Sequence, residues 1–287
     1  MNNLNINICI VQISGNTHAL GFLDQARYFQ HQFRRLGYEA TIEINRIRGE
    51  CVNFIFGAHA GFDTELARHY RCVIVNLEQL GREGATVSGS YIQLLKTSVV
   101  VDYDQSNVSA YRSSSETPII TFGYAPYLRS SYSTEIDCRP IDILFVGSMN
   151  ERRHRILREI QLAGVSVSVL KVGIYGEVRD KEIMRSKAVF NCHFYESARF
   201  EQARVFQCLS LGTAVISERS SNTKPPSIFE DSVFWTSIEN VRTFFEREFG
   251  TDEFFDTARS HLYNFGTHDV GEQYRSAIEY IKEVYAL

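Results

Sequence analysis

The sequence predicts an α/β fold in which two Rossmann-like domains, each with a parallel sheet, face a cleft. Short apolar runs typical of strands alternate with amphipathic segments typical of helices along the whole 287-residue chain. This alternation occurs in both halves, each of about 140 residues, which is ordinary domain size. The polar segment 129–140 separates the halves and is followed at once by a strong strand. We therefore expect two domains, residues 1–135 and 136–287.

The composition narrows the class of protein. The chain is 44% hydrophobic and 22% charged, which is ordinary for a globular protein, and its net charge of −4 argues against non-specific binding of nucleic acid. No apolar run approaches the about 18 residues of a membrane span, and the first residues lack the basic region of a signal peptide. Six cysteines without a CxxC motif indicate buried thiols in a reducing compartment. We expect a cytoplasmic protein with at most peripheral membrane contact.

The first half opens with a strand, a loop and a helix. The strand covers 6–13, and apolar residues from Phe22 to Leu36 recur at helical spacing after it. The loop between them contains Gly15 but no GxGxxG motif, so the fingerprint of a dinucleotide site is absent. His18 ends this loop. It is a candidate general base or phosphate contact, and capping of the helix is the alternative role.

Three further strands of this half each end in polar residues. His59 follows the strand 51–56, Glu78 and Gln79 follow the strand 72–75, and Asp102 follows the strand 99–101. Polar residues at the carboxyl ends of parallel strands converge on the ligand-binding edge of the sheet. His59, Glu78 and Asp102 are therefore candidate catalytic or acceptor-binding residues, and Glu78 has a structural role as its alternative. The segment 118–122 is the predicted last strand.

The second half opens with a strand at 141–146, followed by Gly147 and Ser148. A small residue at this point lets backbone N–H groups approach a phosphate. The helix predicted at 151–162 carries Arg152, Arg153 and Arg155 in its first turn, where the helix dipole favours acids instead. This concentration of positive charge indicates a nearby anion such as a diphosphate, or else a solvated basic face.

The stretch from Ala188 to Glu218 is predicted as strand, loop, helix and strand. Glu201 and Arg204 are three residues apart, so both lie on one face of the first turn of that helix. The turn follows the carboxyl end of a strand, where open α/β sheets bind ligands, and a helix N-terminus favours anions. The alternative is an ordinary βαβ unit with a surface Glu–Arg pair.

Two segments resemble nucleotide-sugar-dependent glycosyltransferases of the GT-B fold. FEQARVFQCLSLGTAVISE (200–218) resembles their donor-binding segment, and ILFVGSMNERRHRIL (143–157) resembles the first strand and nucleotide-side loop of the same domain. In that family a Glu near the start of the helix typically holds the ribose hydroxyls. Glu201 is the matching residue, and Arg204 is placed to reach phosphate. The order NLEQL, VDYDQSN and TFGYAPYL also resembles bacterial cell-surface polysaccharide glycosyltransferases.

The resemblance implies a role for each half. The second would bind the nucleotide-sugar donor, with the last helix crossing back to brace the first domain; its candidate donor-binding residues are Gly147, Ser148, Arg152, Lys171, Tyr175, Glu201 and Arg204. The first would bind the acceptor and offer a base from among His18, His59, Glu78 and Asp102. A leaving nucleoside phosphate needs positive groups nearby, and Arg152, Lys171 and Arg204 are the candidates.

The expected activity is transfer of a hexosyl or related sugar to a glycan or lipid-linked acceptor in polysaccharide biosynthesis. The resemblance implies no metal or other cofactor. The nearest preceding acid, Glu196, is five residues before Glu201, so the E–x7–E spacing of retaining members is missing and the stereochemistry stays open. A nucleotide-sugar epimerase and a degenerate GT-B binding or scaffold module are the alternatives. The acidic balance disfavours a nucleic-acid-modifying sugar transferase.

Overall fold

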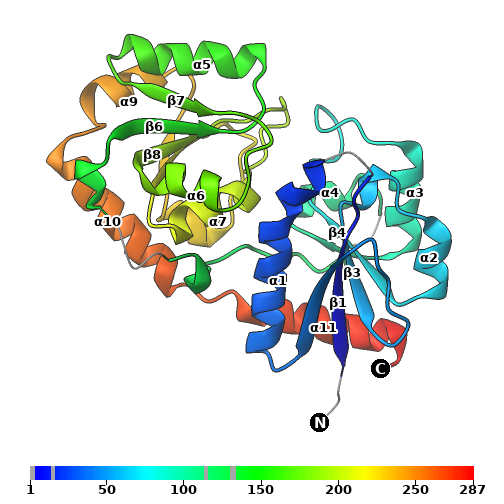
Figure 1. Ribbon diagram of the computed structural model, residues 1–287. Helices are drawn as coiled ribbons and strands as arrows, with labels where there is room; N and C mark the ends of the chain where they lie inside the picture. The colour runs from blue at the N-terminus through cyan, green and yellow to red at the C-terminus, as the bar shows by residue number, and fades with distance from the viewer. Residues whose placement is uncertain (1–3, 14–16, 113–115, 130–133) are drawn as a thin grey trace. The chain divides into compact units, whose positions relative to one another are not determined.

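The chain forms two compact units, each built on one sheet. The computed structural model describes residues 4–13, 17–112, 116–129 and 134–287, with only the backbone at 17–19. One unit comprises Met1–Phe122 with Val270–Leu287, and the other comprises Gly123–Asp269. Each contains a five-stranded sheet whose neighbouring strands all pair in parallel, and helices connect the strands (Figure 1). The predicted α/β class with two parallel sheets is confirmed.

The sheet of the first unit has the strand order β2-β1-β3-β4-β5. The strands β3 and β4 are buried along their whole length, as expected for apolar runs in a sheet covered on both faces. The strands of this unit are β1 (Asn5–Ile10), β2 (Glu39–Ile44), β3 (Val52–Phe56), β4 (Cys72–Asn76) and β5 (Val99–Asp102). Its helices before the last are η1 (Thr17–Phe22), α1 (Leu23–Arg35), η2 (Ala58–Ala60), α2 (Thr64–His69), α3 (Gly89–Thr97) and α4 (Gln105–Val108).

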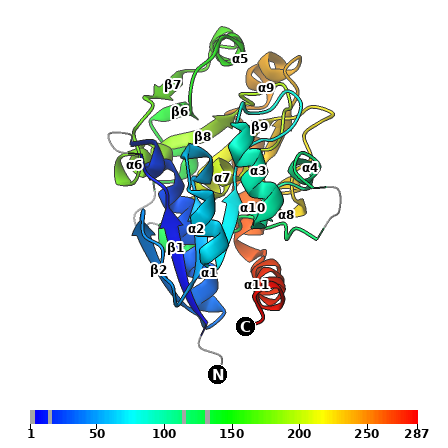
Figure 2. The same ribbon diagram turned by 90° about the vertical axis from the view of Figure 1, so that its right-hand side faces the viewer.

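The last helix, α11 (Gly271–Tyr285), belongs to this first unit and contacts α1 (Figure 2). Tyr274 is fully buried, and its ring lies 5.2 Å from that of Phe29 and 6.3 Å from that of Phe33. Its hydroxyl donates to the carbonyl of Thr121, at 3.2 Å. Farther along the helix, the hydroxyl of Tyr285 donates to the carbonyl of Cys72 at 2.7 Å. Aromatic packing and two hydrogen bonds therefore attach the end of the chain to its first sheet.

The strand predicted at 118–122 is wrong, because this segment makes only an isolated bridge between Ile119 and Asp102. Two backbone hydrogen bonds connect it to the end of β5: Asp102 N–H donates to Pro118 at 3.0 Å, and Ile120 N–H donates to Asp102 at 2.9 Å. Pro118 has no N–H with which to extend the ladder, and β5 itself ends at Asp102.

The sheet of the second unit has the order β10-β9-β8-β6-β7. Its strands are β6 (Ile141–Val146), β7 (Val167–Leu170), β8 (Ser186–Asn191), β9 (Ala214–Glu218) and β10 (Phe234–Thr236). Its helices are η3 (Pro126–Leu128), η4 (Ile136–Cys138), α5 (Glu151–Leu162), α6 (Glu177–Met184), α7 (Gln202–Ser210), α8 (Ser227–Glu230), α9 (Val241–Arg247) and α10 (Asp252–Thr267). Residues from β6, β8, β9 and the helices α5, α9 and α10 share one hydrophobic core.

This unit begins at Gly123, about a dozen residues before the boundary expected near 135. The backbone N–H of Ala125 donates to the hydroxyl of Ser210 at the end of α7, at 3.0 Å. Arg139 is buried, and its guanidinium donates to the carbonyl of Ser186 at 3.0 Å and that of Gly212 at 2.9 Å. Ile136 and Arg139 thus attach the predicted linker to the second unit, and the buried guanidinium of Arg139 is satisfied by carbonyls of that unit.

The cysteines are free thiols, and all but Cys138 are buried. Burial raises the pKa of the Cys192 thiol to about 12, so it behaves as a small apolar side chain. Among the helices of the described ranges, none has both the length and the apolar character needed to cross a membrane.

Replacing Tyr274 with alanine should lower the free energy of unfolding by about 3–5 kcal/mol, because a buried ring and its hydrogen bond are lost. The matched control is Tyr263→Ala on α10, where the side chain is 73% exposed and the cost should stay below about 0.5 kcal/mol. Urea titrations followed by circular dichroism measure both. Equal midpoints for the two variants would show that α11 does not stabilise the first unit.

Candidate active site

The sheet of the second unit reverses its strand order at β6. The chain passes from β6 to β7 on one side and then to β8 on the other. In an open α/β sheet, ligands bind outside the carboxyl ends of the strands at such a switch point. The loops that leave β6 and β8 meet here, and they lead into the N-termini of α5 and α7. Four of the residues predicted to bind a donor, Gly147, Ser148, Glu201 and Arg204, lie on or directly after these two loops.

The buried side chain of Arg153 connects the loop after β6 with the loop after β8. Its side chain is 1% exposed, and its Nη1 donates to the carbonyl of Ser148 at 2.7 Å. Its Nε and Nη2 donate to the carbonyl of Cys192 at 3.1 and 2.6 Å, and Nη2 donates to Oε1 of Glu201 at 3.0 Å. The rings of Phe145 and Phe194 lie 5.2 and 5.1 Å from the guanidinium carbon. One buried cation thus connects the β6 loop, the β8 loop and the carboxylate.

The carboxylate of Glu201 lies between two guanidinium groups. Its other oxygen, Oε2, is 2.5 Å from Nη1 of Arg204, which also donates to Oδ1 of Asn191 at 3.0 Å. The side chains of Glu201 and Arg204 are 12% and 23% exposed, so both still reach solvent. Burial lowers the pKa of Arg153, against the raising effect of Glu201. The spacing of three residues brings Glu201 and Arg204 together, as the sequence predicts.

Gly147 provides the space for both guanidinium groups. A Cβ atom at this position would lie 3.1 Å from Nη2 of Arg204 and 3.2 Å from Nη1 of Arg153. Its φ of +147° also lies in the region that residues with a side chain rarely adopt. The glycine is therefore needed for the packing of the arginines as well as for the turn.

Arg152, expected to contact phosphate, is paired with Glu218 at the end of β9. Its Nη1 donates to Oε2 of Glu218 at 2.9 Å and to the carbonyl of His193 at 3.1 Å, and its Nη2 donates to Oε1 of the same carboxylate. Glu218 is 2% exposed and also accepts the backbone N–H of His193 at 3.0 Å. The pair raises the pKa of Arg152. Arg152 therefore neutralises a buried acid and connects the loops after β8 and β9.

Lys171 and Tyr175 follow β7, on the far side of β6 from β8. Lys171 is exposed and Tyr175 is half-buried. Within the described ranges, neither side chain makes a hydrogen bond or an ion pair with the arginine–glutamate group. The structure therefore does not bring these two predicted donor contacts together with Glu201 and Arg204.

Four residues of this site are absent from the sequence-based assignment: Arg153, Asn191, His193 and Glu218. His193 is fully buried, and its Nε2 lies 3.0 Å from the hydroxyl of Thr223. Burial lowers its pKa, which keeps the imidazole neutral. The sequence could have indicated Asn191, His193 and Glu218, because each is a polar residue at the end of a predicted strand or shortly after it. Arg153 was recognisable only as part of a basic turn, because its inward orientation depends on the fold.

The first unit pairs two of the predicted catalytic residues. Nδ1 of His59, in η2 after β3, lies 3.4 Å from Oε1 of Glu78, after β4, and each side chain is 23% exposed. Two asparagine side chains fix the backbone of Glu78: Asn107 donates to its carbonyl at 3.0 Å, and Asn76 accepts its N–H at 3.2 Å. The pair is thus held at the carboxyl edge of the first sheet.

Asp102 is fully buried and anchors both asparagines. Its carboxylate accepts from Asn76 and Asn107, each at 2.8 Å, and from the hydroxyl of Tyr111 at 2.9 Å. It also accepts two backbone N–H groups, from Tyr103 and the residue after it. Burial raises its pKa despite these bonds. A carboxylate without exposed surface and with five donors positions its neighbours, so we do not retain Asp102 as a base. His18 lies in η1, and its side chain is outside the described part of the structure.

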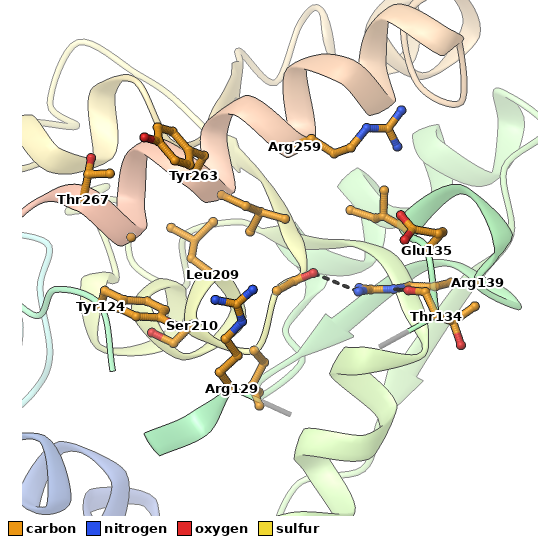
Figure 3. A pocket seen from close by; sticks show the side chains of 15 residues that line it. Tyr124, Arg129, Thr134, Glu135, Arg139, Leu209, Ser210, Arg259, Tyr263 and Thr267 are labelled. Carbon is orange, nitrogen blue, oxygen red and sulfur yellow. Dashed lines mark hydrogen bonds between the residues drawn. The ribbon is translucent and has the colours of Figure 1, made fainter. Parts of the chain in front are cut away.

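A separate cavity of about 480 Å³ lies near the amino ends of the strands of the second unit (Figure 3). It lies between the end of α7 and α10, with Tyr124 and Tyr263 on its wall. Arg139 borders it, but four hydrogen bonds to Thr134, Ser186, Gly212 and Thr213 engage its guanidinium. This arginine therefore joins structural segments. Within the described ranges, no group of three or more His, Cys, Asp or Glu side chains is arranged to hold a metal ion.

The fold is shared with solved glycosyltransferases. The chain is similar to HepE of Anabaena, solved with UDP and glucose, with a TM-score of 0.60 and 12% identity over 98% of this chain and 100% of that chain. It is similar to AviGT4, a glycosyltransferase of avilamycin A biosynthesis, with a TM-score of 0.57 and 10% identity over 99% and 98%. The β-glucosyltransferase of phage T4 gives 0.51 and 11% over 98% of each chain. The architecture is therefore the GT-B fold.

Sequence comparison is less informative. No protein-family model matches the chain. An uncharacterized protein of Acanthamoeba polyphaga mimivirus is 28% identical over 158 residues, which are 49% of this chain and 20% of that protein. A second uncharacterized protein of the same virus is 38% identical over 53 residues, or 18% and 6% of the two. The chain thus corresponds to about a fifth or less of the length of these relatives.

Gly147→Ala should destabilise the second unit by about 1–3 kcal/mol, because the new Cβ meets both guanidinium groups in a strained backbone conformation. Gly266→Ala in α10 is the control: a Cβ there meets nothing within 4 Å, so the change should be neutral or stabilising by up to about 1 kcal/mol. Denaturant unfolding of both variants measures this. Tolerance of alanine at 147 would contradict the packing of the two arginines on the glycine.

His193 should make the second unit sensitive to acid. Its folded pKa is lowered, so the unfolded state binds more protons, and stability is lost as the pH falls below about 6.5. The slope of unfolding free energy against pH should therefore be smaller in His193→Gln than in the wild type, by up to about 1.4 kcal/mol per pH unit. His268→Gln, at an exposed position, is the control. An unchanged slope in His193→Gln would contradict the neutral buried imidazole.

Proposed function

We propose that the protein is a glycosyltransferase that binds a nucleotide-sugar donor on its second unit and transfers the sugar to a hydroxyl of an acceptor. The GT-B fold supports this class of activity, since the fold neighbours include glycosyltransferases. The fold alone does not assign a function, so the proposal depends on the site. The observation that carries it is the group formed by Glu201, Arg153 and Arg204 at the switch point of the sheet.

Two features of this edge favour an anion, namely helix N-termini and the donors of Arg204 that no described residue engages. The side-chain charges themselves balance: Arg152, Arg153 and Arg204 lie against Glu201, Glu218 and the 73% exposed Glu196, which is 3.8 Å from Arg152. The helices α5 and α7 both begin at loops of this edge, and a helix N-terminus carries about half a positive charge. Of the residues that the structure describes, none accepts a hydrogen bond from Nε or Nη2 of Arg204. These two donors fit the oxygens of a diphosphate.

Each proposed contact has a chemical role. The carboxylate of Glu201 accepts the hydrogen bonds of the two ribose hydroxyls, and Arg204 binds the diphosphate. When the bond from the sugar to the phosphate breaks, the leaving group gains negative charge, and Arg204 with the helix N-termini stabilises it. Gly147 lets Arg153 and Arg204 pack against the backbone, and Gly147 and Ser148 remain proposed contacts of the phosphate. Lys171 and Tyr175 remain proposed contacts of the donor.

The donor and acceptor are proposed from the neighbours and from chemistry. HepE has been solved with UDP and with UDP-glucose, so a UDP-hexose is the first donor to test. In the first unit, His59 and Glu78 form a partly exposed pair suited to hydrogen-bonding a hydroxyl of a glycan or lipid-linked acceptor. We further propose that transfer needs no metal, that it takes place in the cytoplasm and that it serves the synthesis of a polysaccharide. We therefore assign donor binding to the second unit and acceptor binding to the first unit.

The proposal is tested by thermal unfolding with UDP, GDP, CMP, ADP, dTDP and their sugar conjugates. A ligand that binds only the folded state must raise the melting temperature. At least one nucleotide should do so, and Glu201→Gln should weaken its binding about 10–100-fold through loss of charged hydrogen bonds.

The matched control is Glu272→Gln. Glu272 is the second residue of α11 and pairs with Arg275 at the same spacing of three residues, but its side chain is 84% exposed. This variant should bind nucleotides like the wild type. If no nucleotide changes the melting temperature, donor binding is refuted. If Glu201→Gln binds as tightly as the control, the assignment of Glu201 is refuted while the fold stands.

A further inference from the structure

The two arginines that hold Glu201 differ in how firmly they are held. Arg153 is 1% exposed and has three hydrogen bonds to backbone carbonyls besides its bond to the carboxylate. Arg204 is 23% exposed and, within the described ranges, has only Glu201 and Asn191 as hydrogen-bonding or charged partners. Removing Arg153 would leave the carbonyl of the buried Cys192 without its partner, whereas Arg204 moves at the cost of two contacts. One partner of Glu201 is therefore permanent and the other is exchangeable.

Arg204 also blocks part of the carboxylate. Its Nη1 lies 2.5 Å from Oε2 of Glu201, while Oε1 is bound by Arg153 at 3.0 Å. Each carboxylate oxygen has two acceptor positions, and Arg153 and Arg204 each occupy one. A nucleoside alone therefore meets a carboxylate that is half occupied and paired with two cations, and its hydroxyls bind more weakly while Arg204 is in place. A diphosphate carries more negative charge than a carboxylate and offers several oxygens, so it competes with Glu201 for the same guanidinium. Arg153 stays behind and keeps the carboxylate paired with a cation.

We infer that Arg204 exchanges partners when the donor binds. Its guanidinium leaves Glu201 and binds the diphosphate, and the carboxylate of Glu201 is then free to accept the ribose hydroxyls. This inference rests on the proposed function and adds a coupling between two parts of the donor site. The coupling must be reciprocal, because each ligand removes the same obstacle to the other. The intact nucleoside diphosphate then binds more tightly than its separate parts predict, and a nucleoside without phosphates is disfavoured.

The test uses isothermal titration with two separate probes, inorganic pyrophosphate and the nucleoside of the best diphosphate from the panel above, with uridine as the first choice. In the wild type, saturating pyrophosphate should tighten nucleoside binding at least about fivefold, and the nucleoside should tighten pyrophosphate binding by the same factor. A 2′,3′-dideoxynucleoside should show no such effect, since it lacks the hydroxyls that Glu201 would accept.

Variants at position 204 distinguish partner exchange by Arg204 from an ordinary contact between Arg204 and the phosphate. Arg204→Gln should weaken pyrophosphate about 10–100-fold, tighten the nucleoside when no pyrophosphate is present, and abolish the coupling. Arg204→Lys, a smaller change, should keep part of the coupling. Glu272→Gln is again the control and should behave as the wild type.

Three outcomes overturn the inference when the nucleoside diphosphate itself binds the wild type. The first is independent binding of the two probes, and the second is absence of nucleoside binding even with pyrophosphate. The third is weaker binding of both probes in Arg204→Gln. If the diphosphate does not bind the wild type at all, the proposed function fails instead, so the two failures are distinguished.

Discussion

The second unit depends on one buried cation. The guanidinium of Arg153 donates to carbonyls of the loops after β6 and β8 and to the carboxylate of Glu201, and it is stacked between two phenylalanine rings. Burying a guanidinium is costly unless every N–H group has a partner, so its surroundings are tightly specified. Because the loops lie at the switch point of the sheet, the same contacts that satisfy the cation also set the position of the carboxylate. The stability of the unit and the geometry of the proposed donor site are therefore linked at this residue.

A second ion pair extends the same arrangement across the sheet. Arg152 and Glu218 join the loop after β8 to the end of β9, and Gly147 provides the space in which Arg153 and Arg204 lie side by side. Three neighbouring strand ends thus contribute charged groups that are mostly paired with one another. Arg204 is also paired with Glu201, but among the residues that the structure describes its Nε and Nη2 have no acceptor. A partly exposed cation with such donors on a frame of buried ion pairs fits the anionic ligand that we propose.

Much of the fold was predictable from local pattern. The strand 141–146 and the helix 151–162 were predicted with the bounds that the structure shows, because a clean apolar run and a capping Asn150 define them. The strand at 118–122 was wrong because its propensity is high while its proline prevents pairing. The short helix α2 was missed, since its six residues have no buried face to create a pattern.

The site was predictable where residues are close in sequence. Glu201 is the N-cap residue of α7 and Arg204 lies in the first turn, three residues later, so their pairing follows from this short separation. The roles of Arg153, paired with a residue 48 positions away, and of Glu218, 66 positions from Arg152, depend on which strands become neighbours. The burial of Asp102 likewise depends on tertiary packing, and a polar residue at a strand end gives no sign of whether it faces a ligand or the interior.

The most direct measurement of the central claim is a crystal structure of the protein with a bound nucleoside diphosphate. The account predicts ribose hydroxyls on the carboxylate of Glu201, phosphate oxygens on Arg204, and Arg153 still bonded to the carbonyls of Ser148 and Cys192. A nucleotide bound elsewhere, or one that leaves Glu201 and Arg204 paired with each other, would contradict it.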